Sequence, residues 1–157
     1  DAKAPHGFGQ LHGNDLRTLG ALYMSSLFPN RAPADKVLLN CFIGGMQDVN
    51  RFGGIDNLTD ENLKRIVLTD VASTGLFKKF DIDFLYDNAE LMQVARWRQA
   101  IPQMGIGHQE ILRDAAAGLS SAGLGEAVSV CGSFANNIAF DRCAEFGLET
   151  ARQLCER

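Results

Sequence analysis

The sequence predicts a mixed fold of the α/β (α+β) class, with elements in the order ββ-α-β-α-β-α. Short segments rich in β-branched and aromatic residues end at glycine or proline, which is typical of strands. Longer segments carry helix caps and apolar residues at helical spacing. The chain has 157 residues, of which 46% are hydrophobic, so residues 1–157 can form one domain with a real core.

The first part of the chain predicts two paired strands. Residues 1–19 contain several glycines and histidines and are expected to form a loop. Residues 20–26 form the first predicted strand and residues 37–43 the second, which Gly44 and Gly45 end. Because the link between them is short, polar and proline-bearing, we expect an antiparallel pair.

The clearest helix signal spans residues 59–74. Thr59 is a suitable N-cap, and Gly75 can adopt the left-handed conformation that often ends a helix. The apolar residues that share one helical face are Leu63, Ile66, Val67 and Val71. This stripe predicts a helix that packs on a sheet, and we expect no chemical role for it.

The second half of the chain is expected to alternate strands and helices. Residues 77–88 show weak periodicity and are interpreted as a connection. Residues 91–97 predict a third strand, which the Pro102 region interrupts, and a helix follows at about 108–119. Residues 127–131 predict a short buried strand, and a final helix covers about 137–155.

Composition argues against several classes of function. The net charge is −4 and the pI is about 5.3, with scattered basic residues, so we expect no nucleic-acid binding. No apolar run reaches the roughly 20 residues of a transmembrane helix, which leaves peripheral membrane association open. The cysteines and histidines lack metal-ligand spacing, and no Ser-His-Asp set supports a hydrolase, so neither a metal site nor a catalytic side chain is expected.

One segment near the C-terminus carries the most specific signal. The predicted strand at 127–131 leads through Gly132 into a helix that is expected to begin at about Asn137. In an open α/β sheet, this geometry places backbone N–H groups and the positive end of a helix dipole beside a ligand, often an anion. We therefore expect a helix N-terminus that faces a ligand.

Several ordered blocks share distinctive residues with one family. Residues 7–11 read Gly-Phe-Gly-Gln-Leu, residues 26–33 read Ser-Leu-Phe-Pro-Asn-Arg-Ala-Pro, and residues 97–103 read Trp-Arg-Gln-Ala-Ile-Pro-Gln. Residues 132–143 are similar to a Gly-Asn-Tyr-x-x-Gly-Val-Ala-Leu-Gly-Arg-Cys pattern. In these blocks the chain resembles the C-terminal part of plastid-type protoporphyrinogen oxidases, within the flavin-containing amine oxidase superfamily. The similarity extends from about residue 7 to the C-terminus and is weakest between 73 and 92.

The resemblance implies a partial flavin-oxidase-like fold. Residues from about 7 to 104 are similar to the substrate domain, and residues from about 105 to 157 to the segment that returns to the flavin domain. The N-terminal Rossmann half of the family binds the flavin diphosphate through Gly-x-Gly-x-x-Gly, a pattern that this sequence lacks. We therefore expect no cofactor in the isolated chain, and FAD only where a partner half completes the site.

The resemblance also implies two sets of site residues. Leu11, Leu22 and Phe42 match positions that line the tetrapyrrole pocket, although apolar residues on strands belong to a core more often than to a ligand wall. The positions that match flavin contacts are Trp97, Gln103, Gly132, Ile138, Ala139 and Phe140. Asn137 and Asp141 stand where the family pattern has glycines, and they add bulk and charge near the flavin.

Two functional hypotheses follow from the resemblance. The favoured one is a non-catalytic accessory or structural subunit of a larger plastid membrane complex, thylakoid-associated and photosynthetic in role, with protein partners over the face that the missing half leaves. The alternative is the C-terminal part of a split or cleaved FAD-dependent protoporphyrinogen oxidase in haem and chlorophyll biosynthesis. A chlorophyll contact through His6, His12 or His108 is a further hypothesis.

Overall fold

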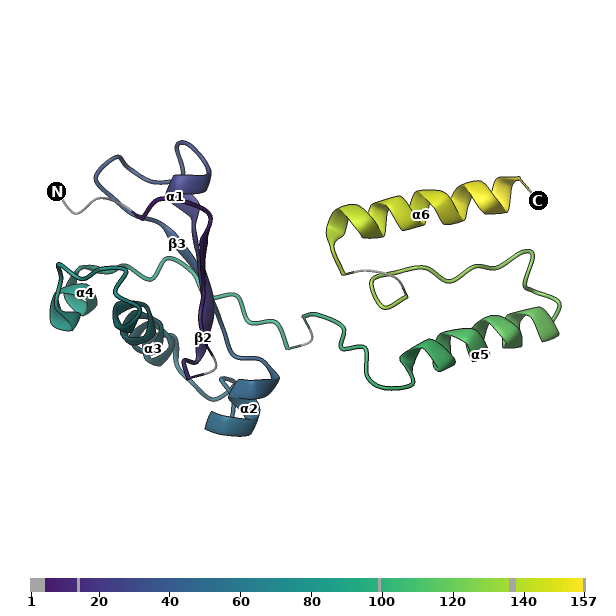
Figure 1. Ribbon diagram of the computed structural model, residues 1–157, viewed down its shortest axis with the longest axis horizontal. Helices are drawn as coiled ribbons and strands as arrows, with labels where there is room; N and C mark the ends of the chain where they lie inside the picture. Colours follow the sequence, from purple (N-terminus) through teal and green to yellow (C-terminus); the bar gives the residue numbers. More distant parts are fainter. Residues whose placement is uncertain (1–4, 14, 99, 136–137, 157) are drawn as a thin grey trace. The chain divides into compact units, whose positions relative to one another are not determined.

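The chain forms two compact units, each with its own set of helices. The computed structural model describes residues 5–13, 15–98, 100–135 and 138–156 (Figure 1). Unit 1 covers residues 1–94 and unit 2 covers residues 95–157. Helices are combined with a small antiparallel sheet, which agrees with the mixed α+β class.

The sheet of unit 1 is a meander with the strand order β1-β2-β3. Its strands are β1 (Gly9–Leu11), β2 (Thr18–Tyr23) and β3 (Leu39–Ile43), and both neighbouring pairs are antiparallel. The predicted antiparallel pair is therefore confirmed as β2 and β3. The predicted loop at 1–19 is wrong at β1, which is too short to show a clear period, and at residues 18–19, where β2 begins. Residues 1–4 and 14 of that loop lie outside the described residues. Residues 24–26 leave the strand to start the short helix α1 (Met24–Leu27).

The predicted helix at 59–74 is confirmed as α3 (Asp60–Ser73). Thr59 Oγ1 accepts a hydrogen bond from the Asn62 backbone N–H at 3.2 Å, as an N-cap does. Gly75 follows with φ of +79°, the conformation expected of it. On the apolar stripe, Leu63 and Val71 are buried, which agrees with the prediction that this helix packs on the sheet.

Two further helices of unit 1 were not predicted. The segment at 77–88, interpreted as a connection, contains α4 (Ile82–Asn88). Asp81 Oδ1 caps this helix by accepting a hydrogen bond from the Phe84 N–H at 2.7 Å. An aspartate at this position is a sequence signal for a helix start. The helix α2 (Met46–Phe52) lies between Gly45 and Gly53, and Gly53 ends it with φ of +79°.

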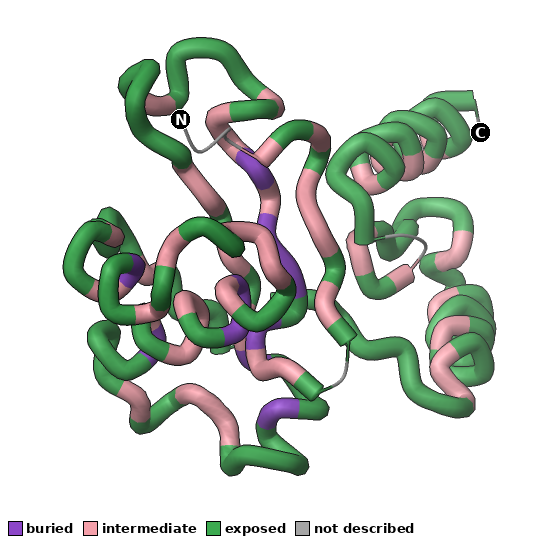
Figure 2. Tube along the Cα trace, turned by 60° about the vertical axis from the view of Figure 1, so that its left-hand side comes forward, coloured by how far each residue is buried: buried purple, intermediate pink, exposed green. Residues whose placement is uncertain are grey.

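The core of unit 1 lies between the sheet and the helix layer. In Figure 1, α3 and α4 lie on the same side of the sheet. The buried apolar residues are Ala21, Tyr23, Leu63, Val71 and Leu85. Figure 2 shows the buried positions along β2 and the facing helices, and no described residue of unit 2 is buried.

Unit 2 consists of two helices joined by an irregular segment. The predicted helices are confirmed as α5 (His108–Ser121) and α6 (Phe140–Cys155), which lie on opposite sides of that segment in both views (Figures 1 and 2). The described part of α6 begins at Phe140, whereas Asn137, the predicted start, lies outside the described residues. No helix in the described ranges is long and apolar enough to cross a lipid bilayer.

The strands predicted at 91–97 and 127–131 are wrong, so the order ββ-α-β-α-β-α does not hold. A strand exists only through hydrogen bonds to a neighbour, and neither segment pairs with another strand in the described residues. At 127–131, the Ala127 and Val128 N–H groups donate instead to the Leu124 carbonyl in a turn. Residues 127–131 are therefore exposed turn and coil, and they do not form a buried strand.

Candidate functional site

The sheet brings the three residues that match tetrapyrrole-pocket positions onto one face. Leu11 of β1 and Phe42 of β3 both pair with Gly20 of β2, one from each side. Leu22 lies two residues beyond Gly20 on β2, and side chains two residues apart in a strand point to the same face. We call the face that carries Leu11, Leu22 and Phe42 the Leu11 face.

The Leu11 face is open in this chain. Leu11 is 94% exposed and Phe42 is 49% exposed, while Leu22 is half-buried. At Gly20 an added Cβ would lie 2.6 Å from the Gln10 carbonyl oxygen and 3.4 Å from Leu11 Cδ2, so this position has no room for a side chain. The face therefore presents the apolar side chains of Leu11, Leu22 and Phe42 around the buried Gly20, a surface on which a flat apolar ring can stack.

The opposite face of the sheet is covered by α3. Ala21 and Tyr23 point to this side and are buried, and burial raises the pKa of the Tyr23 hydroxyl. Cys41, the pairing partner of Ala21 on β3, lies on the same side, and burial raises the pKa of its thiol to about 11. The core of unit 1 is on this covered side, so Leu11 and Phe42 do not belong to it.

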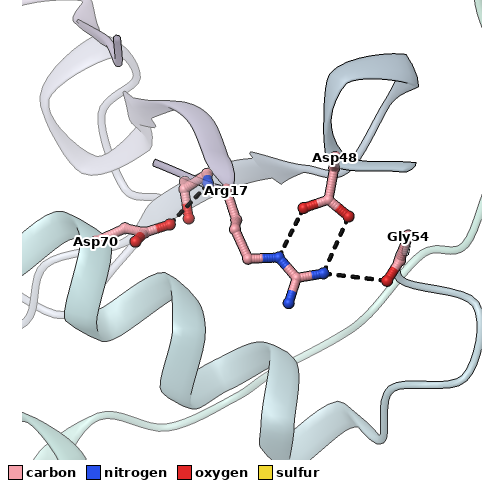
Figure 3. Close-up of polar contacts among 5 residues, drawn as sticks. Arg17, Asp48, Gly54 and Asp70 are labelled. Carbon is pink, nitrogen blue, oxygen red and sulfur yellow. Dashed lines mark hydrogen bonds and ion pairs between the residues drawn. The ribbon is translucent and has the colours of Figure 1, made fainter. Parts of the chain in front are cut away.

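A partly buried ion-pair cluster at the start of β2 was not anticipated from the sequence (Figure 3). Arg17 donates to both carboxylate oxygens of Asp48, at 2.6 and 3.0 Å, and to the Gly54 carbonyl at 3.1 Å. Asp70 Oδ2 accepts from the Thr18 backbone N–H at 2.7 Å. The hydrogen bond to Asp48 raises the pKa of the Arg17 guanidinium, assisted by the negative charges of Asp48 and Asp70.

One sequence signal could have found this cluster. Asp70 falls on the apolar stripe of α3, four residues after Ile66 and three after Val67. A carboxylate on a buried stripe needs hydrogen-bond partners, which Asp70 finds at the start of β2. The cluster joins β2, α2 and α3, and its role is architectural.

A shallow depression of about 480 Å³ adjoins this cluster and is separate from the Leu11 face. Its lining residues are Asp15, Arg17, Phe52, Arg65, Ile66, Thr69, Asp70 and Tyr86. None of them is a residue that the sequence predicts to be in a site. The two arginines each lie over an aromatic ring, Arg17 over Phe52 at 5.1 Å and Arg65 over Tyr86 at 4.6 Å.

In unit 2, the residues that match flavin contacts lie on exposed coil and at one helix end. Trp97 is 76% exposed, and Gln103 Nε2 donates to the nearby Ile101 carbonyl at 3.4 Å. Ile138 and Phe140 are 50% and 91% exposed. These apolar side chains are available to a ligand, and unit 2 does not enclose them.

Gly132 has a local structural reason to be glycine. An added Cβ would lie 2.8 Å from the Phe134 ring, so the ring occupies the space of a side chain. His108 at the start of α5 holds the same turn, because its Nε2 lies 2.6 Å from the Phe134 carbonyl oxygen and must donate to it. The turn at 132–135 is therefore fixed by contacts inside unit 2.

The N-terminus of α6 carries mixed signals for an anion. Ala139 is its N-cap and has no side-chain acceptor, so the first turn relies on other partners. Asp141 places a carboxylate in that first turn, and Arg142 Nη1 is engaged with Glu145 Oε2 at 2.7 Å. This helix end suits a neutral polar edge better than a dianionic diphosphate.

The described histidines take part in no cluster of ligand-type side chains that could hold a metal ion. No group of three or more ligand-type side chains gathers within the described ranges. His12 uses both ring nitrogens, with Nδ1 at 2.8 Å from the Thr18 carbonyl oxygen and Nε2 at 2.6 Å from Gln10 Nε2. A chlorophyll contact through His12 would therefore require one of these hydrogen bonds to break.

Comparison with known proteins gives a consistent set of relatives. Residues 1–155 match the family described as "Flavin containing amine oxidoreductase". The chain is 38% identical over 152 residues to "Protoporphyrinogen oxidase, chloroplastic" of Oryza sativa subsp. japonica, which covers 96% of this chain and 26% of that protein. It is 39% identical over 147 residues to "Protoporphyrinogen oxidase 1, chloroplastic" of Arabidopsis thaliana, with coverage of 92% and 25%.

A more distant relative is "Coproporphyrinogen III oxidase" of Bacillus subtilis (strain 168), which is 26% identical over 141 residues, 90% of this chain and 27% of that protein. No solved structure matches the chain. The chain spans about a quarter of the length of the curated relatives that it matches. Because the family match covers almost all of the sequence, this chain belongs to the flavin containing amine oxidoreductase family.

Proposed function

We propose that this chain is the C-terminal part of a split or cleaved FAD-dependent protoporphyrinogen oxidase that acts in tetrapyrrole biosynthesis. The observation that carries the proposal is the gathering of Leu11, Leu22 and Phe42 on one open sheet face. Three residues that similarity alone assigns to a tetrapyrrole wall thus share a surface. The similarity to chloroplastic protoporphyrinogen oxidases over more than nine-tenths of the chain supports the same assignment.

The proposed role of the Leu11 face is to bind and to exclude water. Its apolar side chains flank Gly20, and Asn40 of β3, the pairing partner of Leu22, adds an amide. Leu11, Leu22, Phe42 and Asn40 are not ionisable, so the role proposed for them is binding and not proton transfer. A macrocycle is held there by burial of apolar surface and ring stacking.

The segment around Phe140 fits the ring system of a flavin. Trp97, Ile138 and Phe140 offer exposed apolar surface, and Gln103 offers an amide. The backbone at Ala139 would belong to the residues that hold the flavin, and the carboxylate of Asp141 disfavours a diphosphate at the same helix end. When bound, the flavin supplies the electron acceptor that the oxidation requires. The diphosphate would be held by a companion polypeptide with Gly-x-Gly-x-x-Gly.

Similarity to whole oxidases favours this proposal over the accessory subunit. The accessory role was motivated partly by Asn137, which lies outside the described residues, and by Asp141. Asp141 is also favourable in the first turn of any helix, so it does not argue against catalysis. The chloroplastic names of the relatives support a plastid location, and thylakoid association is the finer proposal.

The first test is the absorption spectrum of the protein purified from its native source with everything that stays bound. We expect flavin bands at a near-equal molar ratio and oxidation of protoporphyrinogen by the same preparation. A preparation without flavin, either with chlorophyll bands or within a large complex that lacks oxidase activity, would instead support the accessory role.

A matched pair of phenylalanines tests the substrate face. Phe42 lies on the Leu11 face and is 49% exposed, and Phe28 follows α1 and is 47% exposed. We expect Phe42→Ala to weaken the binding of protoporphyrin IX about tenfold through lost apolar burial, whereas Phe28→Ala leaves it unchanged. Equal behaviour of the two variants would show that the face does not bind the macrocycle.

A further inference from the structure

The side chains on either side of Leu11 are anchored to the covered face of the sheet. Gln10 Nε2 donates to Thr74 Oγ1 at the end of α3, at 3.0 Å. Gln10 Oε1 accepts from the Tyr23 hydroxyl at 3.0 Å, and Gln10 Nε2 lies 2.6 Å from His12 Nε2. We call Gln10, His12, Tyr23 and Thr74 the Gln10 network.

The hydrogens of the Gln10 network can be assigned completely. Thr74 donates its hydroxyl hydrogen to the Val71 carbonyl at 2.7 Å, so its oxygen accepts from Gln10. His12 Nδ1 must donate to the Thr18 carbonyl, which has no hydrogen, so a neutral His12 accepts at Nε2 from the second amide hydrogen of Gln10. Each amide hydrogen of Gln10 then has one acceptor and its carbonyl has one donor, which defines a single orientation of the side chain.

This network compensates for the weak attachment of β1. The strand is short and lies at the edge of the sheet, so only β2 pairs with its backbone. The bond from Gln10 to Thr74 ties β1 directly to α3, across 64 positions of sequence. Because neighbouring strand residues point to opposite faces, anchoring Gln10 and His12 on one face directs Leu11 to the other. Leu11 Cδ2 accordingly lies over Gly20.

We propose that Gln10 is a positioning residue for a flat tetrapyrrole: through the Gln10 network it holds Leu11 over Gly20 as one wall of the binding surface. This inference rests on the proposed function. Leu11 is 94% exposed and adds little to the stability of unit 1, so its orientation matters for a ligand and not for the core. Gln10 itself does not touch the ligand.

Threonine variants of α3 test the proposal without touching the Leu11 face. Thr74→Val keeps the shape and removes the acceptor of Gln10, Thr74→Ser keeps the acceptor, and Thr69→Val removes another exposed hydroxyl of the same helix that bonds to Tyr86. In the complete protein with any polypeptide that co-purifies, we expect Thr74→Val to weaken protoporphyrin IX binding about fivefold, read by porphyrin absorbance. For Thr74→Val we also expect KM to rise while kcat stays nearly constant. We expect Thr74→Ser and Thr69→Val to bind porphyrin as the unchanged protein does.

A double-mutant cycle with Leu11 decides whether Gln10 acts through it. Gln10→Leu should weaken porphyrin binding in the native background and have no further effect in a Leu11→Ala background. An equal effect in both backgrounds, or a Thr74→Val variant that binds normally, overturns the inference while leaving the proposed function intact. Failure of the unchanged protein to bind porphyrin overturns the proposed function itself, and the positioning role with it.

Discussion

Units 1 and 2 have similar hydrophobic sequences but differ in how much apolar surface each one buries. Unit 1 packs α3 and α4 on one side of its sheet and buries Ala21, Leu63 and Val71. In unit 2 no described residue is buried, and Phe140 is 91% exposed at the start of α6. The difference follows from the sheet, because its covered face gives the helices of unit 1 an apolar surface to pack on.

Because of this difference, we expect stability to come from unit 1 and contacts with a partner to involve unit 2. Unit 1 has a core and an ion pair whose Asp48 carboxylate is buried, and we expect it to unfold cooperatively. Unit 2 exposes apolar surface of the kind that marks an interface, which agrees with the proposed companion half. The aromatic chromophores separate the two units: Tyr23 and Tyr86 belong to unit 1, and Trp97, the single tryptophan, belongs to unit 2.

The largest effect is expected from Arg17→Ala. This change leaves the Asp48 carboxylate, which is 2% exposed, buried without its bidentate partner. Removing one member of such a pair costs about 3–5 kcal/mol of unfolding free energy. Urea denaturation followed by the near-ultraviolet circular dichroism of the tyrosines, which lie in unit 1, should show this loss. The fluorescence of Trp97, which reports on unit 2, should be the same in the variant and in the unchanged chain.

As a control, Arg51→Ala breaks the exposed pair with Asp15 at 3.8 Å and should cost less than about 1 kcal/mol. Equal costs would contradict the burial of the Asp48 carboxylate in this pair.

A leucine in each unit gives the next largest contrast. Leu63 of α3 is buried and Leu148 of α6 is exposed. Leu63→Ala should cost about 2–4 kcal/mol because it removes apolar contacts and leaves a cavity. Leu148→Ala should change stability by less than about 0.5 kcal/mol in the isolated chain. If Leu148→Ala destabilised the isolated chain as strongly, unit 2 would have a core of its own.

Cys41 provides a pH-dependent contrast of moderate size. Burial raises its pKa to about 11 from an ordinary value of 9.0, so between these values the unfolded chain loses the thiol proton before the folded one does. The stability of unit 1 should therefore fall as pH rises from about 9 to about 11, by at most about 2 kcal/mol from this group. Burial also raises the pKa of Tyr23, so both groups affect stability at high pH. The difference between the pH profiles of Cys41→Ala and of the unchanged chain gives the contribution of the Cys41 thiol alone. Parallel pH profiles would show that the thiol is not buried in solution.

The smallest contrast concerns helix caps. Thr59 caps α3 with its side chain, whereas the N-cap of α6 is Ala139. Thr59→Ala should destabilise unit 1 by about 1 kcal/mol, and Ala139→Asp should raise the helicity of α6 in the isolated chain. In the flavin-containing protein, the same Ala139→Asp change should weaken flavin retention, because the new carboxylate competes for the helix N-terminus. Unchanged flavin retention with increased helicity would place the flavin elsewhere.

Local signals in the sequence predicted the helices better than the strands. Thr59 and Gly75 mark the ends of α3 through interactions with their own neighbours, so sequence alone identifies it. The segments at 91–97 and 127–131 have strand-like composition but no partner strand among the described residues, and pairing is not a local property. The short helix α4 was missed because Asp81 followed a stretch without a clear period.

The candidate site could be predicted only through resemblance. Nothing local distinguishes Leu11, Leu22 and Phe42 from core residues, and their common face became visible only with the register of the sheet. The Arg17 cluster depends on contacts across more than thirty residues, so it could be suspected only from the unusual position of Asp70. The roles of Gly132 and His108 likewise depend on the position of Phe134.

The meander order of the sheet also has a kinetic consequence. Leu11, Leu22 and Phe42 all lie within residues 11–42, and neighbouring strands pair across short links, so the face that carries them closes only small loops. Such local pairings form quickly and are available early as a chain is synthesised. The bond from Gln10 to Thr74 closes a much longer loop and needs α3 to be docked on the sheet. We therefore expect the Leu11 face to form before the Gln10 network closes.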